Sequence, residues 1–181
     1  HTQGLNTAFH VLNNAVYHAY LEGKPYLRNG IQVAGNGSTV IGNYVEGAPL
    51  THDWASTAIG VINGDNIIVE NNRINHIPDI GINVMNYSVS EMKNITLSNN
   101  TIENALHGIR ISGKASENRF VHSLLIEDNV IKAPIGNVSF SGIAFYEVNV
   151  QTLTAIRNTF DDVYYAFDPF ADHVTYQDIS I

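Results

Sequence analysis

The chain has 181 residues, of which 44% are hydrophobic and 14% charged, so it can bury a sizeable core and is not a disordered polymer. Its net charge of −8 argues against nucleic-acid binding, and the absence of cysteine excludes a disulfide scaffold and a thiolate metal site. No apolar run approaches the ~20 residues that a membrane-spanning helix needs, so we expect no membrane insertion.

A nine-residue pattern recurs along the chain at a nearly constant interval. Its clearest copies cover residues 66–74, 94–102 and 123–131, with weaker copies at 9–16, 38–45 and 153–160. One asparagine holds the same place in every copy, with steps of 29, 29, 28, 29 and 29 residues: Asn14, Asn43, Asn72, Asn100, Asn129 and Asn158. A period this regular indicates a repeat architecture.

Each repeat predicts three short strands and no helix. Apolar residues alternate in the pattern, as Ile67 and Val69 do, and another follows the asparagine by two positions. The asparagine therefore lies in a bend between two strands. A third strand is predicted across a loop, at residues 30–33, 58–61, 81–84, 108–111, 142–145 and 166–168. Three strands per coil at a fixed period predict a parallel β-helix, since one coil cannot bury its apolar face alone.

The aligned asparagines fit this interpretation. An asparagine tolerates a left-handed φ at a tight bend, and a stack of six can link their side-chain amides into a hydrogen-bonded ladder.

With its asparagine series, its Asn-Asn-x-Ile copies and its Gly-Ile-x-Val strands, the chain resembles the right-handed parallel β-helix superfamily. That group includes pectate-lyase-like enzymes, other polysaccharide lyases and hydrolases, epimerases and phage tailspikes. The resemblance implies an all-β, right-handed, single-stranded parallel β-helix of six to seven coils of ~29 residues. Many functions share this scaffold, so the resemblance is specific for the fold and weak for the activity.

No linker interrupts the period, so we expect one β-helix domain over residues 1–181. The last residues, 178–181, match the start of a strand pattern, which predicts an unfinished coil. We therefore expect a longer chain, flanking domains or a homo-oligomer to cap the open coil ends.

The resemblance implies a substrate groove over one parallel sheet, here the sheet of Gly-Ile-x-Val strands. The outward residues of these strands are predicted to form a column: Gln32, Gly60, Asn83, Arg110, Ala144 and Asp168. Loops entering the sheet add His52, Asp53 and Trp54 from residues 46–54, His76 and Asp79 from residues 75–79, and His107 from residues 103–107. Tyr146 and Glu147 continue beyond the column.

The candidate catalytic residues are His76, Asp79, His107 and Arg110. Arginine binds a carboxylate or sulfate with two parallel bonds, so Arg110 could neutralise a uronate and make its neighbouring C–H easier to remove. His107 or His76 could act as the base, with Asp79 orienting it. The alternatives are a surface ion pair of Arg110 with Asp79 or Glu147, and a simple loop hydrogen bond between His76 and Asp79.

The candidate substrate-binding residues are Trp54, His52, Asp53, Asn83, Tyr146 and Asp168. Trp54 is either a platform for a sugar ring or a lid over the core. Asp53 and Asp79 could instead be the two carboxylates of a glycosidase. No metal ligand is assigned and no cofactor is firmly implied; Asp161 and Asp162 leave Ca²⁺ as an option.

Two functions follow from these observations. The first is a secreted or surface-displayed module that binds and cleaves a polysaccharide, as a lyase or a glycoside hydrolase. The second is a non-catalytic rod, such as a tailspike, adhesin or surface-layer segment. The P-loop, dinucleotide, HExxH and GxSxG motifs are absent, as are pectate-lyase-type acidic clusters and the alginate-epimerase signature.

Overall fold

The computed structural model describes the backbone of residues 7–17, 29–47, 56–133, 140–169 and 175–180. Within these ranges the regular structure is β-strand, apart from one 3-10 turn, η1, at Ala115–Glu117. None of these segments forms a helix long and apolar enough to cross a membrane.

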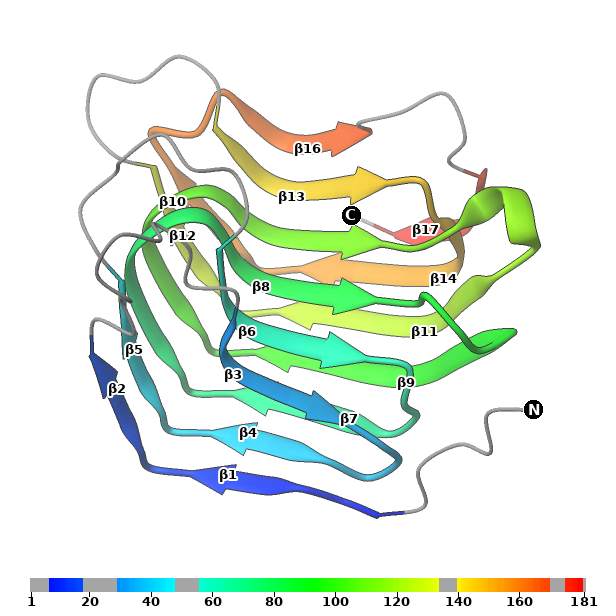
Figure 1. The fold of residues 1–181 in the computed structure, drawn as a ribbon. Helices are drawn as coiled ribbons and strands as arrows, with labels where there is room; N and C mark the ends of the chain where they lie inside the picture. The colour runs from blue at the N-terminus through cyan, green and yellow to red at the C-terminus, as the bar shows by residue number, and fades with distance from the viewer. Residues whose placement is uncertain (1–6, 18–28, 48–55, 134–139, 170–174, 181) are drawn as a thin grey trace.

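The strands wind into a coil with three faces (Figure 1). The first face is a seven-stranded sheet of β1 (His10–Leu12), β4 (Thr39–Ile41), β7 (Ile67–Glu70), β9 (Glu91–Ser98), β11 (Phe120–Glu127), β14 (Asn149–Ile156) and β17 (Thr175–Ser180). The second face holds β2 (Ala15–Tyr17), β5 (Tyr44–Glu46), β12 (Val130–Lys132) and β15 (Thr159–Asp161). The third face holds β3 (Asn29–Ala34), β6 (Thr57–Ile62), β13 (Ser141–Tyr146) and β16 (Tyr165–Pro169). Two long strands, β8 (Arg73–Met85) and β10 (Thr101–Ser112), run across both the second and third faces.

All strand pairs are parallel, and their registers stack like residues over like. On the third face the predicted column is confirmed, because each member lies opposite the next: Gln32, Gly60, Asn83, Arg110, Ala144 and Asp168. The predicted parallel β-helix is therefore the fold of this chain.

The core lies inside the coil and is built from aliphatic side chains of all three faces. Ile67 and Val69 of the first face are fully buried, as are Ile74 of the second and Ile82 of the third. Burying a side chain of this size contributes about 1.5–3 kcal/mol, so the stacked coils supply the stability that one coil lacks.

The predicted asparagine ladder is confirmed. Asn72 shows its pattern: its backbone N–H and its side-chain Nδ2 donate to Oδ1 of Asn100, at 3.1 and 2.9 Å. Nδ2 of Asn72 also donates to the carbonyl of Val40 in the preceding coil, at 2.8 Å. The same side-chain bonds link the whole series from Asn14 to Asn158.

The ladder asparagines do not adopt the left-handed conformation that the sequence suggested. That conformation belongs to the preceding residue, with φ between 53° and 69°: Asn13, Gly42, Asn71, Asn99, Asp128 and Arg157. The chain bends there from the first face to the second, and the amide of the following asparagine bonds along the stack.

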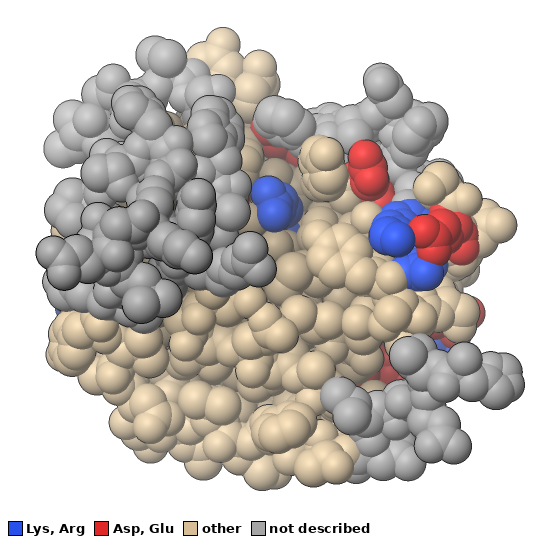
Figure 2. Space-filling view, viewed as in Figure 1, with Lys and Arg blue, Asp and Glu red and all other residues tan. Residues whose placement is uncertain are grey.

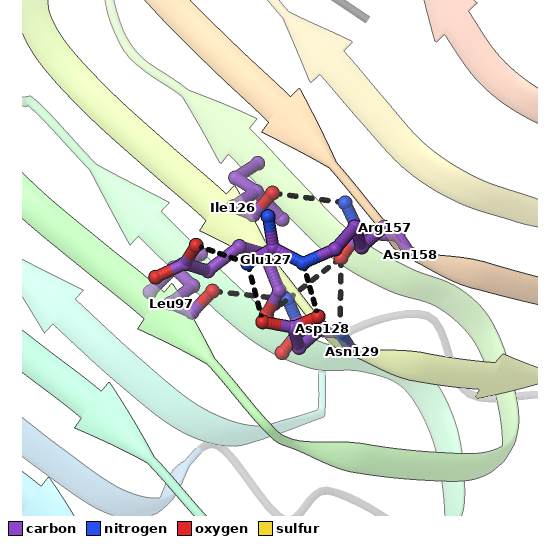
Figure 3. Close-up of polar contacts among 7 residues, drawn as sticks. All are labelled: Leu97, Ile126, Glu127, Asp128, Asn129, Arg157 and Asn158. Atoms are coloured by element: carbon purple, nitrogen blue, oxygen red, sulfur yellow. Dashed lines mark hydrogen bonds and ion pairs between the residues drawn. The ribbon is translucent and has the colours of Figure 1, made fainter.

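At the last of these bends, Arg157 clamps two neighbouring coils together (Figure 3). Its Nε and Nη2 donate to the two carboxylate oxygens of Asp128 at 2.8 and 2.7 Å, and Nη2 also donates to Glu127 at 2.8 Å. The Arg157 side chain is 59% exposed, so solvent screens its ion pair with Asp128. The ion pair therefore adds little to the stability of the fold.

The loops expected at residues 75–79 and 103–107 are not loops, because β8 and β10 continue through them. His76 and Asn104 have φ of 54° and 58°, and these residues turn each strand from the second face to the third. Ile77 pairs with Ala105, and Ile80 pairs with His107. Two residues of β8 therefore lie opposite the single residue between Ala105 and His107, so β8 carries one extra residue there. Such a bulge redirects the side chains at that point, which include Asp79.

Candidate functional site

Glycines at the start of the third-face strands place two columns of residues on the same outer surface. One column contains Arg110, and the other contains His107 and Ser141. A Cβ on Gly108 would lie 2.5 Å from Cγ2 of Ile131, and one on Gly142 would lie 2.4 Å from the Phe160 ring, so both positions face the inside of the coil. The next residue, such as Ile109, is also buried in the core. Because two successive residues face inward, the residue before each glycine lies on the outer side with the column of Arg110.

Arg110 is at the centre of this surface and is partly buried. With its amide oriented for hydrogen bonding, Asn83 accepts a bond from Nη2 of Arg110 at 3.2 Å and donates to Ser112 Oγ at 2.9 Å. The ring of Tyr146 lies 6.0 Å from Cζ of Arg110. Asn83 is 2% exposed, so a buried amide holds the guanidinium, which lies over the ring of Tyr146.

The alternative for Arg110, a surface ion pair with Asp79 or Glu147, is not observed among the described residues. Nε of Arg110 is buried and has no hydrogen-bond partner within that part of the chain. The positive charge of the guanidinium is therefore not neutralised by a carboxylate within ion-pair distance among the described residues, and it can attract an anion.

The charge of Arg110 affects the pKa of Asp79, although the two side chains lie beyond ion-pair distance. It is only 5% exposed, and burial raises the pKa of its carboxyl, while the positive charge of Arg110 opposes that rise. Its carboxyl therefore keeps a proton to higher pH than an exposed aspartate does.

His107 lies on β10 directly opposite Ile80 of β8 and Ser141 of β13. Burial and the nearby charge of Arg110 lower the pKa of His107 to about 4, and the charge of Asp168 opposes this. At neutral pH its imidazole is therefore uncharged and can accept a proton.

Asp168 and Ser141 complete the cluster. Ser141 Oγ donates to Asp168 Oδ2 at 2.6 Å, and the two residues are 1% and 9% exposed, respectively. The bond joins β13 to β16 and holds the Asp168 carboxylate near the imidazole of His107.

The structure thus brings together six of the predicted site residues: Asp79, Asn83, His107, Arg110, Tyr146 and Asp168. His76 lies apart, at the corner of β8, where its Nδ1 is 3.8 Å from Glu46 Oε1. No described contact joins His76 to Asp79, His107 or Arg110. His52, Asp53 and Trp54 lie outside the described residues, so the proposed Asp53–Asp79 pair lies outside them too.

Sequence reasoning missed Ser141, although a signal for it was present. Ser141 precedes Gly142 as His107 precedes Gly108, so the strand pattern places both in one column. The exposed pair Tyr164 and Tyr165 was also not assigned to the site, although Tyr165 lies opposite Ser141.

Within the described ranges, no group of three or more His, Cys, Asp or Glu residues could hold a metal ion. Asp161 lies 3.9 Å from Lys132 and, like Asp162, is exposed. The visible part of the third face carries few charged groups, with a basic group near its centre and mixed charges at one edge (Figure 2).

A family model described as a right-handed β-helix region matches residues 6–171. The chain belongs to this family. No curated protein and no solved structure matched it significantly. The right-handed β-helix family accounts for the fold, and this fold supports many different activities.

Proposed function

We propose that the chain is a carbohydrate-active module that binds an acidic polysaccharide over the third face and cleaves it by β-elimination. The observation that carries this proposal is the position of Arg110. Its guanidinium has no ion-pair partner among the described residues and lies beside an uncharged His107 and a buried Asp79.

Binding begins with the acidic group of one sugar. A uronate carboxylate takes two hydrogen bonds from Arg110, which Asn83 holds in place. Pairing with arginine withdraws negative charge from the carboxylate, so the hydrogen on the adjacent ring carbon becomes more acidic.

The elimination then needs a base and an acid. His107 accepts the proton from the carbon next to the carboxylate, and the electron pair left behind forms a C=C bond as the neighbouring glycosidic C–O bond breaks. The leaving oxygen takes a proton from Asp79, whose raised pKa favours the protonated carboxyl.

Substrate binding also makes His107 a better base. The positive charge of Arg110 is one cause of the low pKa of His107 in the free protein. A bound carboxylate cancels much of that charge, so this cause of the low pKa weakens in the complex, while burial, the larger cause, remains. A glycan of this kind lies outside cells, which favours a secreted or surface-displayed protein.

The test is an assay of acidic glycans for unsaturated products, with polygalacturonate, alginate, hyaluronan and a neutral dextran as the panel. Unsaturated ends should form from at least one acidic glycan and not from dextran. His107→Ala and Arg110→Ala should each lower the rate by at least roughly 100-fold. New reducing ends without unsaturation would indicate a hydrolase, and full activity in both variants would exclude this site.

A non-catalytic β-helix rod is the second candidate. It is favoured by the burial of Asp79, Asn83 and Asp168, which are at most 9% exposed and could form an internal polar network. A rod should bind or cleave none of these glycans and should form a trimer or filament in light scattering.

A further inference from the structure

Two adjacent tyrosines lie exposed at the start of β16. Tyr164 is 62% exposed and Tyr165 is 47% exposed. Their ring centroids are 4.5 Å apart and the rings are nearly perpendicular, at 88°. Two large aromatic side chains left in solvent at one point are typical of a binding surface.

The backbone fixes this pair before any ligand arrives. The N–H groups of Tyr164 and Tyr165 both donate to the carbonyl of Phe140, at 2.9 and 3.1 Å, and Phe140 is itself 4% exposed. A tyrosine has few rotatable bonds, so a pair anchored in this way loses little entropy on binding.

The register of the strands places the pair beside the charged cluster. Tyr165 lies opposite Ser141, and Ser141 lies opposite His107, so two strand spacings, about 10 Å, separate the backbones of Tyr165 and His107. The register therefore puts Tyr165 in the same column as Ser141 and His107. The negative charge of Asp168 contributes to a raised pKa of Tyr165, after the larger effects of Tyr164 and burial, which also indicates that Asp168 is near.

We propose that Tyr164 and Tyr165 form an aromatic subsite that packs against a pyranose ring of an acidic glycan, another sugar of which is bound at Arg110. This inference rests on the proposed function and adds to it the direction of the substrate. The glycan crosses β10, β13 and β16 obliquely, because Asp168 is in register with Arg110 and Tyr165 lies three residues before Asp168. Its acidic group lies at Arg110 and one ring face lies on the tyrosines. The separation of the two subsites is one that a short oligosaccharide spans.

Chemistry on both sides supports this occupant. The axial C–H groups of a pyranose form an apolar face that packs on the negative face of an aromatic ring, and the phenol hydroxyls can bond the sugar hydroxyls. Arg110 supplies the matching positive charge for an acidic sugar. A purely apolar partner would not neutralise the positive charge of Arg110.

The experiment measures binding by affinity electrophoresis in gels containing polygalacturonate, alginate, hyaluronan or neutral dextran. The test protein is the Tyr164→Ala/Tyr165→Ala double variant. Tyr17→Ala is the matched control, because Tyr17 is 60% exposed and lies on β2, at the opposite end of the coil. Tyr165→Phe keeps the ring and removes only the hydroxyl. Circular dichroism and thermal unfolding check that each variant folds.

We expect an acidic glycan to retard the wild-type protein, with the double variant binding roughly tenfold more weakly or worse. Tyr17→Ala should bind as the wild type does, and Tyr165→Phe should keep most of the affinity. In the cleavage assay the double variant should raise KM more than it lowers kcat.

The outcomes separate this inference from the proposed function. If the wild-type protein binds an acidic glycan and the double variant binds it equally well, the aromatic subsite is wrong and the proposed function stands. A loss of affinity in Tyr165→Phe as large as in the double variant would overturn ring packing. If the wild-type protein binds none of the four glycans, both proposals fail.

Discussion

The hydroxyl of Ser141 donates a 2.6 Å hydrogen bond to Asp168 Oδ2, although the two residues are 27 positions apart in sequence. The bond is buried and joins strands of two successive coils, so it fixes a carboxylate beside His107. A change in the charge of Asp168 or Arg110 should therefore change the pKa of His107.

The first prediction concerns Asp168. Its negative charge raises the pKa of His107, so Asp168→Asn should lower that pKa further below about 4. Titration of the His107 ring protons by NMR measures this directly. Ser141→Ala is the milder variant, since it keeps the charge. A wild-type His107 that titrates near 6.5 would contradict the environment described for it.

The second prediction concerns Arg110. Its charge lowers the pKa of both His107 and Asp79, so Arg110→Gln should raise both pKa values. NMR titration of the His107 ring and of the Asp79 carboxyl carbon would follow the two groups in one sample. Arg73→Gln is a suitable control, because Arg73 lies at an exposed position of the second face and contacts Glu103. Equal shifts in both variants would show a general charge effect rather than proximity to Arg110.

The third prediction is a pH dependence of stability. The pKa of His107 falls from 6.5 to about 4 on folding, so the uncharged ring is favoured in the folded state. This stability is complete above pH 6.5 and is lost as pH falls towards 4, by up to about 3 kcal/mol. Urea unfolding at pH 7, 6, 5 and 4 should show the loss, and His107→Gln should remove that part of it.

Asp79 acts in the opposite direction over part of the same range. Burial raises its pKa in the folded state, so its contribution is complete below the unfolded value and is lost as pH rises through the folded value. Asp79→Asn should therefore steepen the fall in stability between pH 6 and pH 4. The same pH profile for Asp79→Asn and for the wild type would mean that Asp79 ionises normally.

The fourth prediction tests the asparagine ladder. Asn100→Ala removes an acceptor for two donors of Asn72 and leaves the carbonyl of Val69 and Oδ1 of Asn129 without the Nδ2 donor. Stranding several buried polar groups should cost about 3 kcal/mol in the free energy of unfolding. Asn14→Ala, at the exposed first position, should cost about 1 kcal/mol or less. Similar losses at both positions would argue against burial as the source of the ladder's strength.

The fifth prediction tests the inward glycines. A Cβ at Gly108 would lie 2.8 Å from the carbonyl oxygen of Gly142 and 2.5 Å from Cγ2 of Ile131. Gly108→Ala should therefore cost about 2 kcal/mol or more, because backbone and a packed core side chain must both move. At Gly113 the nearest atom is 3.3 Å away, so Gly113→Ala should be tolerated much better. Thermal unfolding of the two variants gives the comparison.

The repeat in the sequence determined the fold of this protein. Residues at equal positions in a 29-residue period must stack when the chain coils, so the ladder from Asn14 to Asn158 follows from spacing alone. The column from Gln32 to Asp168 has uneven steps, and it follows instead from the recurring Gly-Ile-x-Val strand pattern. Alternation of Ile67 and Val69 was enough to tell inside from outside within a regular strand.

Only the tertiary structure decided how the site is assembled, because its key features break that regularity. The inward glycines turn His107 and Ser141 to the outer side, the extra residue in β8 lies beside Asp79, and the corner at His76 takes that histidine away from Arg110. Sequence spacing also cannot give burial or the distance between charges, and these two quantities set the ionisation of His107 and Asp79.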